Sequence, residues 1–326
     1  PLALWIENQD HARWLGKDVP GYTVPRPGHA DLAGVVKYGL DDIRPALERA
    51  SARETAARVA AGAACRALLA QFDIRVGGYV AAIGAVEADL SAIPLAERAA
   101  RALLNEVHCP DPRAAEAMQA RIRQVMQERD TLGGVLEVIA LGLPAGLGSY
   151  VQWDRRLDAQ LAAALMSVQA IKGVEIGPAF ANTRLPGTQV HDAIHAGAPG
   201  AFTRGGVNSG GLEGGVTTGQ PLLLRAAMKP IATTLNPQRS VDLAGGAEVD
   251  TRYERSDYCP VPRAVVILEA MTAFVLANAL IEKLGGDSLD EMRPRYAALR
   301  RAGLPDAALT QRRHVFWPTA EAADGE

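Results

Sequence analysis

Two arginines flank a candidate anion site in the run Arg49-Ala50-Ser51-Ala52-Arg53. Ser51 and Glu54 have the S-x-x-E spacing of a capping box, which predicts that a helix begins near Ser51. The first amides of a helix have no partner within the helix and attract anions. Guanidinium groups bind phosphate and carboxylate through paired hydrogen bonds. This segment therefore predicts a phosphate or carboxylate site, and a solvated helix start is the alternative interpretation.

Two further segments carry groups that could move protons. His29 lies in the turn Arg26-Pro27-Gly28-His29-Ala30-Asp31, and imidazole exchanges protons readily near neutral pH. Asp257 lies close to a cation and a thiol in Arg255-Ser256-Asp257-Tyr258-Cys259. Each segment also has a plain interpretation, namely a surface histidine for the first and a structural ion pair for the second.

A glycine-rich stretch over residues 205–219 offers room for a flat or anionic ligand. It contains three glycine pairs and ends in Thr217-Thr218-Gly219. It has neither the lysine that closes a P-loop nor a G-x-G-x-x-G fingerprint after a strand. Exposed backbone N–H groups in such a stretch can bind anions. A flexible surface loop is the alternative.

The histidines and cysteines do not predict a metal centre. His191 and His195 have the spacing of a zinc-protease helix, but Asp192 stands where such a helix has its glutamate. The three cysteines lie far apart and are odd in number, which argues against a disulfide framework and favours reduced thiols. We therefore expect no bound metal.

Composition argues against several classes of protein. The 326 residues include 34 Lys and Arg against 37 Asp and Glu, and a net charge of −3 disfavours an electrostatic nucleic-acid binder. Hydrophobic residues make up 48% of the chain, which excludes wholesale disorder. The apolar residues 264–281 approach the length of a membrane span. Glu269 lies within them and Gly285-Gly286 follows, so we expect a buried helix in a soluble, cytoplasmic protein.

The elements that must position these groups alternate irregularly. The pattern predicts strands over residues 2–7, 74–86, 135–143, 222–228 and 231–234. It predicts helices that begin near Ser51, Asp111, Asp154 and Pro262. Gly77-Gly78 in the second strand is expected to mark either a bulge or a crossing point. Because strands and helices do not alternate regularly, the sequence favours an α+β fold over a doubly wound parallel sheet.

In their order along the chain, these segments resemble the chorismate synthase family. The resemblance rests on residues 26–31 (RPGHAD), 49–56 (RASARETA), 58–62 (RVAAG), 167–177 (SVQAIKGVEIG), 208–211 (NSGG), 214–219 (GGVTTG), 229–230 (KP) and 255–259 (RSDYC). It extends over residues 2–286. The chain departs from the family at Gln169, Ile231 and Ala232, where some relatives have Asn, Thr and Ser, and at RSDYC, where RHDPC is commoner.

The resemblance implies a single α+β domain over residues 1–326, a β-α-β sandwich with helices packed between antiparallel sheets, assembled as a homotetramer. It implies a carbon–oxygen lyase that acts on phosphates in the shikimate pathway of aromatic amino-acid biosynthesis. The implied reaction is the anti-1,4-elimination of phosphate from 5-enolpyruvylshikimate 3-phosphate to give chorismate. Reduced FMN is required without net redox change, and NAD(P)H enters only as the source of reduced flavin. No nucleic-acid or membrane partner is expected.

The resemblance also implies roles for individual residues. His29 is implied to be a proton donor that balances charge on the flavin, and Asp257 to assist, through the flavin, in removing the C6 proton. The implied FMN contacts are Arg49, Ala50, Ser51, Gln169, Ala170, Gly214, Lys229, Pro230, Ile231, Ala232, Thr233 and Arg255.

The two ends of the chain also carry expectations. The family begins several tens of residues earlier, so the chain is expected to be N-terminally incomplete, and residues 318–326 are expected to fray. Two alternatives follow. One is a truncated or degenerate member that binds flavin or assembles without catalysis, and the other is an unrelated glycine-rich binding module.

Overall fold

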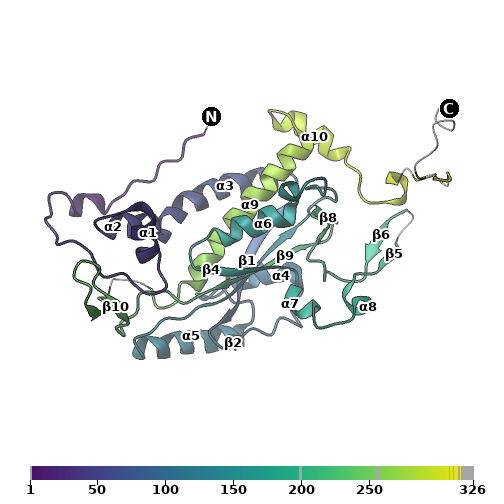
Figure 1. Cartoon of the computed structure of the whole chain (residues 1–326). Coiled ribbons are helices and arrows are strands. Elements are labelled where there is room, and N and C mark those ends of the chain that lie inside the picture. Colours follow the sequence, from purple (N-terminus) through teal and green to yellow (C-terminus); the bar gives the residue numbers. More distant parts are fainter. Residues whose placement is uncertain are drawn as a thin grey trace.

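A five-stranded antiparallel sheet forms the centre of the molecule (Figure 1). The computed structural model describes residues 2–197, 200–253, 257–307, 309–310, 312–314 and 316. The strands follow the order β2-β1-β3-β9-β4. Their bounds are β1 (Arg75–Ile83), β2 (Val86–Glu87), β3 (Gly134–Leu141), β4 (Ile171–Ile176) and β9 (Leu222–Met228). Helices combined with antiparallel sheets confirm the predicted α+β class.

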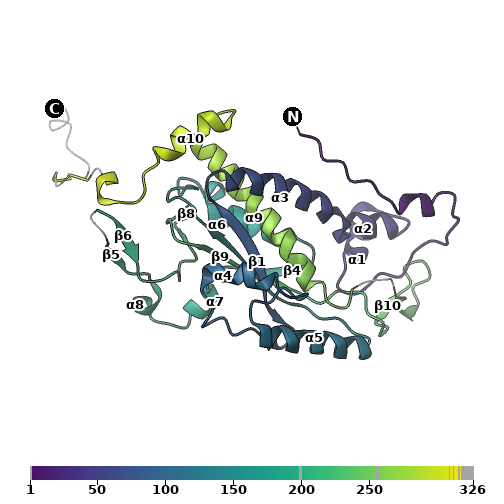
Figure 2. The same ribbon diagram turned by 180° about the vertical axis from the view of Figure 1, so that it is seen from behind.

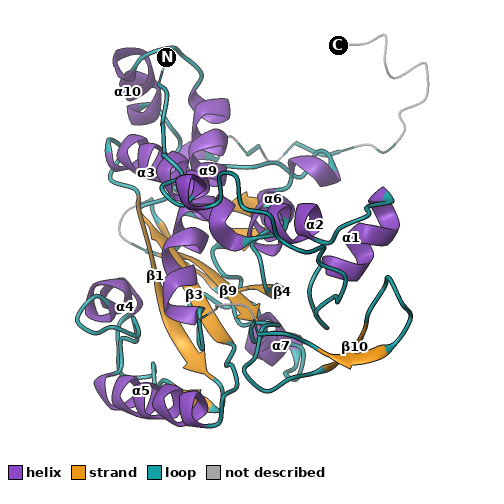
Figure 3. Ribbon diagram, turned by 90° about the vertical axis from the view of Figure 1, so that its left-hand side faces the viewer, coloured by secondary structure: helices purple, strands orange, loops and turns teal. Residues whose placement is uncertain are grey.

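Three helices cover one face of this sheet (Figure 3). They are α3 (Thr55–Ala70), α6 (Leu157–Met166) and α9 (Val261–Leu284). Leu157, Leu161 and Leu165 recur at helical spacing and are fully buried. α9 is long and apolar enough to cross a membrane, yet 61% of its most apolar window is buried in the protein. It therefore fills the core, as its sequence predicts.

α3 and α9 approach each other unusually closely. A Cβ atom built on Gly62 would lie 2.3 Å from Cβ of Ala270 and 2.5 Å from its Cα. Only a residue without a side chain fits at this crossing. The alanine-rich sequence of α3 thus serves the close packing of two helices.

Smaller elements surround the central layers (Figure 2). On the opposite face, α4 (Leu95–Ala102) contacts β1. α5 (Pro112–Gln127) lies beside β2, and its predicted Asp111 cap is confirmed, since the carboxylate accepts the amides of Arg113 and Ala114. The remaining helices are α1 (Asp31–Tyr38), α2 (Arg44–Arg49), α7 (Ala179–Asn182), α8 (Gly187–Val190) and α10 (Leu289–Ala297). Three ribbons complete the fold: β5 (Ile194–Ala196) with β6 (Phe202–Arg204), β7 (Leu212–Glu213) with β8 (Val216–Thr217), and β10 (Arg239–Val241) with β11 (Glu248–Asp250).

Two predicted strands are wrong. Residues 2–7 lie in an exposed loop, with Trp5 91% exposed, and no described strand pairs with them. Residues 231–234 also form a loop. Pro230 has no N–H with which to continue the ladder of β9, and the carbonyl of Ile231 instead accepts the hydroxyl of Thr131 at 2.8 Å.

Two local predictions also need correction. The bulge in β1 lies between Val80 and Ala82 rather than at Gly77-Gly78, whose positions pair regularly with β3. The alternative, a crossing point, agrees with the close approach of α9, since a Cβ atom on Gly78 would lie 3.0 Å from Cγ1 of Val265. Asp154 lies in a 3-10 turn, and α6 begins three residues later at Leu157. The predicted tail over residues 318–326 lies outside the described residues.

The capping box at Ser51 forms only in part. The Ser51 hydroxyl accepts the amide of Arg53 at 3.3 Å and caps a 3-10 turn (Ala52–Glu54) that leads into α3. The Glu54 carboxylate does not return to Ser51. It binds Gln169 and Arg58, because a charge-assisted pair with a guanidinium is stronger than a bond to a backbone amide.

Candidate functional site

Most of the predicted site residues meet at one end of the central sheet. Gly134, the first residue of β3, pairs there with Met228, the last residue of β9. The loop between α6 and β4 also lies at this end. Its residue Ala170 accepts, through its carbonyl, the amide of Lys229 at 2.9 Å. α3 reaches the same end, because Glu54 just before it binds Gln169. The loops at this end therefore bring together residues far apart in the sequence.

The loop over residues 229–233 is the centre of this arrangement. A Cβ atom on Gly28 would lie 3.8 Å from Cβ of Ala232 and 3.9 Å from Nζ of Lys229. Thr233 is buried and accepts Nη1 of Arg26 at 3.2 Å. The turn that carries His29 thus packs directly on the predicted flavin-binding loop.

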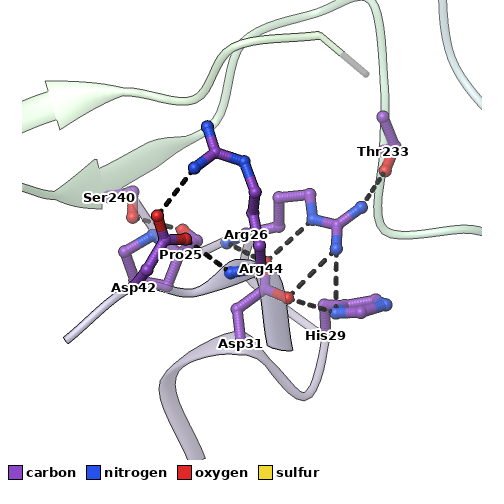
Figure 4. Close-up of polar contacts among 8 residues, drawn as sticks. All are labelled: Pro25, Arg26, His29, Asp31, Asp42, Arg44, Thr233 and Ser240. Carbon is purple, nitrogen blue, oxygen red and sulfur yellow. Dashed lines mark hydrogen bonds and ion pairs between the residues drawn. The ribbon is translucent and has the colours of Figure 1, made fainter. Parts of the chain in front are cut away.

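His29 is held by a buried ion pair (Figure 4). Its Nδ1 lies 2.5 Å from Oδ1 of Asp31, whose side chain is completely buried. Arg26 donates to the same carboxylate through Nε, at 2.8 Å to Oδ2, and through Nη2, at 3.0 Å to Oδ1. The second ring nitrogen of His29, Nε2, points away from this group, and the ring remains 22% exposed.

The Asp31 carboxylate is ionised in the folded protein. Burial raises the pKa of Asp31, but hydrogen bonds from His29 and Arg26 and the charge of Arg26 outweigh burial and hold that pKa well below its usual range. Asp31 also opens α1, where the helix dipole favours a negative charge. An ionised carboxylate therefore lies next to Nδ1 of His29.

Gln169 presents a buried oxygen without a partner. Its Nε2 donates to Oε1 of Glu54 at 2.7 Å, and the same oxygen lies 2.7 Å from Nη2 of Arg58. The hydrogen bond from Gln169 and the pairing with Arg58 lower the pKa of Glu54. Oε1 of Gln169 is inaccessible and accepts no hydrogen bond from the described residues. A ligand with an N–H donor would satisfy it.

Cationic groups gather near these residues. Burial and the charge of nearby Lys172 lower the pKa of Lys229. Within the described ranges, no ion pair joins an acidic side chain to either lysine, and the ammonium group of Lys229 donates to the carbonyl of Pro230 at 3.4 Å. Arg49 is 78% exposed and lies 3.9 Å from Glu54. Two ammonium groups without an acidic partner among the described residues and an exposed guanidinium suit an anionic ligand.

Asp257 lies at the same end of the sheet. The carbonyl of its neighbour Tyr258 accepts the amide of Leu132 at 2.8 Å, next to the start of β3. Oδ2 of Asp257 accepts Nη1 of Arg263 at 2.8 Å, and the carboxylate is 42% exposed. The predicted contact Arg255 lies outside the described residues.

Gly214 does not join the other predicted contacts within one chain. It lies in the turn between β7 and β8, beside Gly215, whose carbonyl accepts the amide of Leu157 at the start of α6. That turn is at the opposite end of β9 from Lys229, about 20 Å away along seven residues of strand. A flavin contact at Gly214 stays a prediction.

Asp192, which lies between His191 and His195, holds a loop in place. Oδ1 and Oδ2 of Asp192 accept the amides of Asn208 and Ser209 at 3.0 and 2.9 Å, so this carboxylate anchors the glycine-rich stretch. Among the residues with described positions, no group of three His, Cys, Asp or Glu side chains could hold a metal ion.

The sequence predicts no role for Arg26 or Asp31 in the site, and for Glu54 it predicts only a role in capping a helix. All three lie within motifs that were singled out, but their partners are set by the fold. A guanidinium and a carboxylate flanking one histidine in a proline–glycine turn is the signal that could have identified Arg26 and Asp31.

Comparison with known proteins identifies the family. A family model described as chorismate synthase matches residues 1–281. The chorismate synthase of Chlorobaculum tepidum is 50% identical over 319 residues, which cover 93% of this chain and 80% of that protein. That of Trichlorobacter lovleyi is 52% identical over 309 residues, which cover 90% and 79%.

A solved structure agrees with these relatives. A crystal structure of chorismate synthase superposes with a TM-score of 0.71 at 44% identity and covers 82% of this chain and 75% of that one. The predicted fold is thereby confirmed, and with it the activity of a lyase in the shikimate pathway. The chain belongs to the chorismate synthase family.

Proposed function

We propose that the end of the sheet around residues 229–233 binds reduced FMN and 5-enolpyruvylshikimate 3-phosphate, and that phosphate is eliminated there to give chorismate. One observation carries this proposal. His29, Gln169 and Asp257 lie in three segments far apart in sequence, and each segment contacts the loops at this end. Such convergence of a proton carrier, a ligand acceptor and a carboxylate is what the reaction requires.

The residues present fit a flavin. The buried Oε1 of Gln169 needs a donor, and the isoalloxazine ring carries an N–H that can serve. Lys229 and Arg49 supply positive charge for the FMN phosphate or the substrate phosphate, and the capped turn at Ser51 presents backbone amides. Reduced FMN, when bound, lends electron density that helps to expel phosphate and then regains it, so the reaction has no net redox change.

The side chains divide the remaining work. His29 holds a proton close to the ligand, with its position fixed by Asp31. Asp257 offers a partly exposed carboxylate that can take up a proton, and Arg263 holds it in place. The cationic groups bind the departing phosphate, whose charge rises as its bond to carbon breaks.

Further properties of the assembly are part of the proposal. We propose a single domain and a homotetramer in the cytoplasm, with NAD(P)H acting only as the source of reduced flavin. The net charge of −3 supports the absence of a nucleic-acid partner. The burial of α9 supports the absence of a membrane partner. No observation favours the non-catalytic alternative.

Replacement of Gln169 by Met tests the flavin site. The change keeps the length of the side chain and removes the buried acceptor, so we expect the Kd for reduced FMN to rise about 5- to 100-fold, equivalent to about 1–3 kcal/mol. Anaerobic titration followed by flavin fluorescence measures the change. Gln160→Met, in α6, the helix that ends three residues before Gln169, is the matched control. Equal affinity in both variants would contradict the proposed site.

A further inference from the structure

We propose that Asp31 is a positioning residue that makes Nε2 of His29 the nitrogen that exchanges protons. The inference deepens the proposed function and rests on it. Nδ1 of His29 and Oδ1 of Asp31 are 2.5 Å apart, and the carboxylate has no exposed surface (Figure 4). Nη2 of Arg26 also lies 3.0 Å from Nδ1, but it has Oδ1 of Asp31 as an acceptor at the same distance. An ionised carboxylate only accepts hydrogen bonds and lies nearer to Nδ1 than the guanidinium does, so Nδ1 carries the hydrogen.

The Asp31 carboxylate receives a full set of donors. Oδ2 accepts the backbone amide of Arg26 at 3.0 Å and Nε of Arg26 at 2.8 Å. Oδ1 accepts Nη2 of Arg26 at 3.0 Å and Nδ1 of His29. Four donors fill the four acceptor positions of a carboxylate. The carboxylate therefore has no freedom to rotate or to donate, and the tautomer of His29 is fixed.

Arg26 makes this arrangement rigid. Its guanidinium side chain is only 9% exposed and also donates to the buried hydroxyl of Thr233 at 3.2 Å. Thr233 belongs to the loop that is proposed to bind FMN. One ion pair therefore orients the imidazole and ties its turn to the ligand-binding loop. With Nδ1 committed to Asp31, the proton that His29 gives or takes is held at Nε2, on the side away from the ion pair.

Asparagine at position 31 should reverse the tautomer. An amide has one oxygen, so it cannot accept all four donors. Placing its NH₂ group at the Oδ1 position loses one bond from Arg26, whereas placing it at the Oδ2 position loses two. The first orientation is favoured, and there the NH₂ group donates to Nδ1. Neutral His29 must then carry its hydrogen on Nε2.

The test is ¹⁵N NMR of protein labelled in its six histidines, with His29→Gln used to assign the His29 signals. At a pH of about 9, where free imidazole is neutral, we expect hydrogen on Nδ1 in the unmodified chain and on Nε2 in Asp31→Asn. We expect kcat to fall about 10²-fold in Asp31→Asn, with the Kd for FMN changed less than about threefold. Asp31→Glu, which keeps the carboxylate, should keep hydrogen on Nδ1.

Asp42→Asn is the matched control. Asp42 accepts the amides of Tyr22 and Arg44 and the guanidinium of Arg44, in the same part of the molecule (Figure 4). Among the described residues, no histidine forms a hydrogen bond or ion pair with it. The Asp42→Asn substitution should change neither the tautomer of His29 nor kcat. Hydrogen on Nε2 of His29 in the unmodified chain overturns the proposal, even if Asp31→Asn fails to fold. So does an Asp31→Asn variant that retains hydrogen on Nδ1. Since the spectra need neither flavin nor substrate, they are independent of whether chorismate is formed.

Discussion

Replacement of Asp257 by Asn is expected to lower kcat by about 10²- to 10⁴-fold, the usual contribution of a group that moves a proton in the transition state. The Kd for reduced FMN is expected to change less than about threefold. Asparagine has the same shape as aspartate and can still accept Nη1 of Arg263. It has no basic oxygen. The loss should therefore fall on turnover and not on binding, measured as kcat and Kd on the same preparation.

The position of Asp257 makes this substitution informative. It lies four residues before α9, and the adjacent contact between Tyr258 and Leu132 fixes the loop through backbone atoms only. Asp287→Asn, in an exposed position beyond the other end of α9, is the control and should leave kcat unchanged. Turnover of Asp257→Asn within a fewfold of this control would remove Asp257 from the mechanism.

Replacement of Gly62 by Val is expected to destabilise the fold by about 3 kcal/mol or more. The first added carbon alone would lie 2.3 to 2.5 Å from Cβ and Cα of Ala270. No flexible side chain can move aside, so α3 and α9 must separate. Urea unfolding followed by far-UV circular dichroism measures the loss of stability.

Ala63→Val is the control for this prediction. Ala63 is the next residue of α3 and is exposed, so valine there costs only its lower helix propensity, about 0.6 kcal/mol. If Gly62→Val and Ala63→Val unfold at the same urea concentration, the close crossing of α3 and α9 does not exist in solution.

The fold could be predicted for elements whose caps and apolar patterns in the sequence match the residues that the fold buries. β9 matches its predicted range, α9 begins one residue earlier than predicted, and the Asp111 cap starts α5 as expected. Residues 2–7 have the composition of a strand. A strand also needs a neighbouring strand with which to form hydrogen bonds, and local sequence does not show whether one is present. The loop after Pro230 contains apolar residues because it packs against the turn at Gly28 and the segment at Thr131. It does not pair with a neighbouring strand.

The site could be predicted only in part, for a similar reason. His29, Gln169 and Asp257 were assigned through the resemblance to a family. The partners that give them their chemistry are distant in sequence: Glu54 and Gln169 are 115 residues apart, and Arg26 and Thr233 are 207 apart. Periodicity and capping report on neighbours along one element. They carry no signal for contacts between loops that the fold brings together.

Formation of chorismate under anaerobic conditions tests the central claim most directly. The chain would be mixed with chemically reduced FMN and 5-enolpyruvylshikimate 3-phosphate, and chorismate and free phosphate would be followed together. We expect equal amounts of both, at a turnover of about 1 per second or faster, and only when reduced FMN is present. If reduced FMN binds but no chorismate forms, the non-catalytic alternative is correct and the proposed function is wrong.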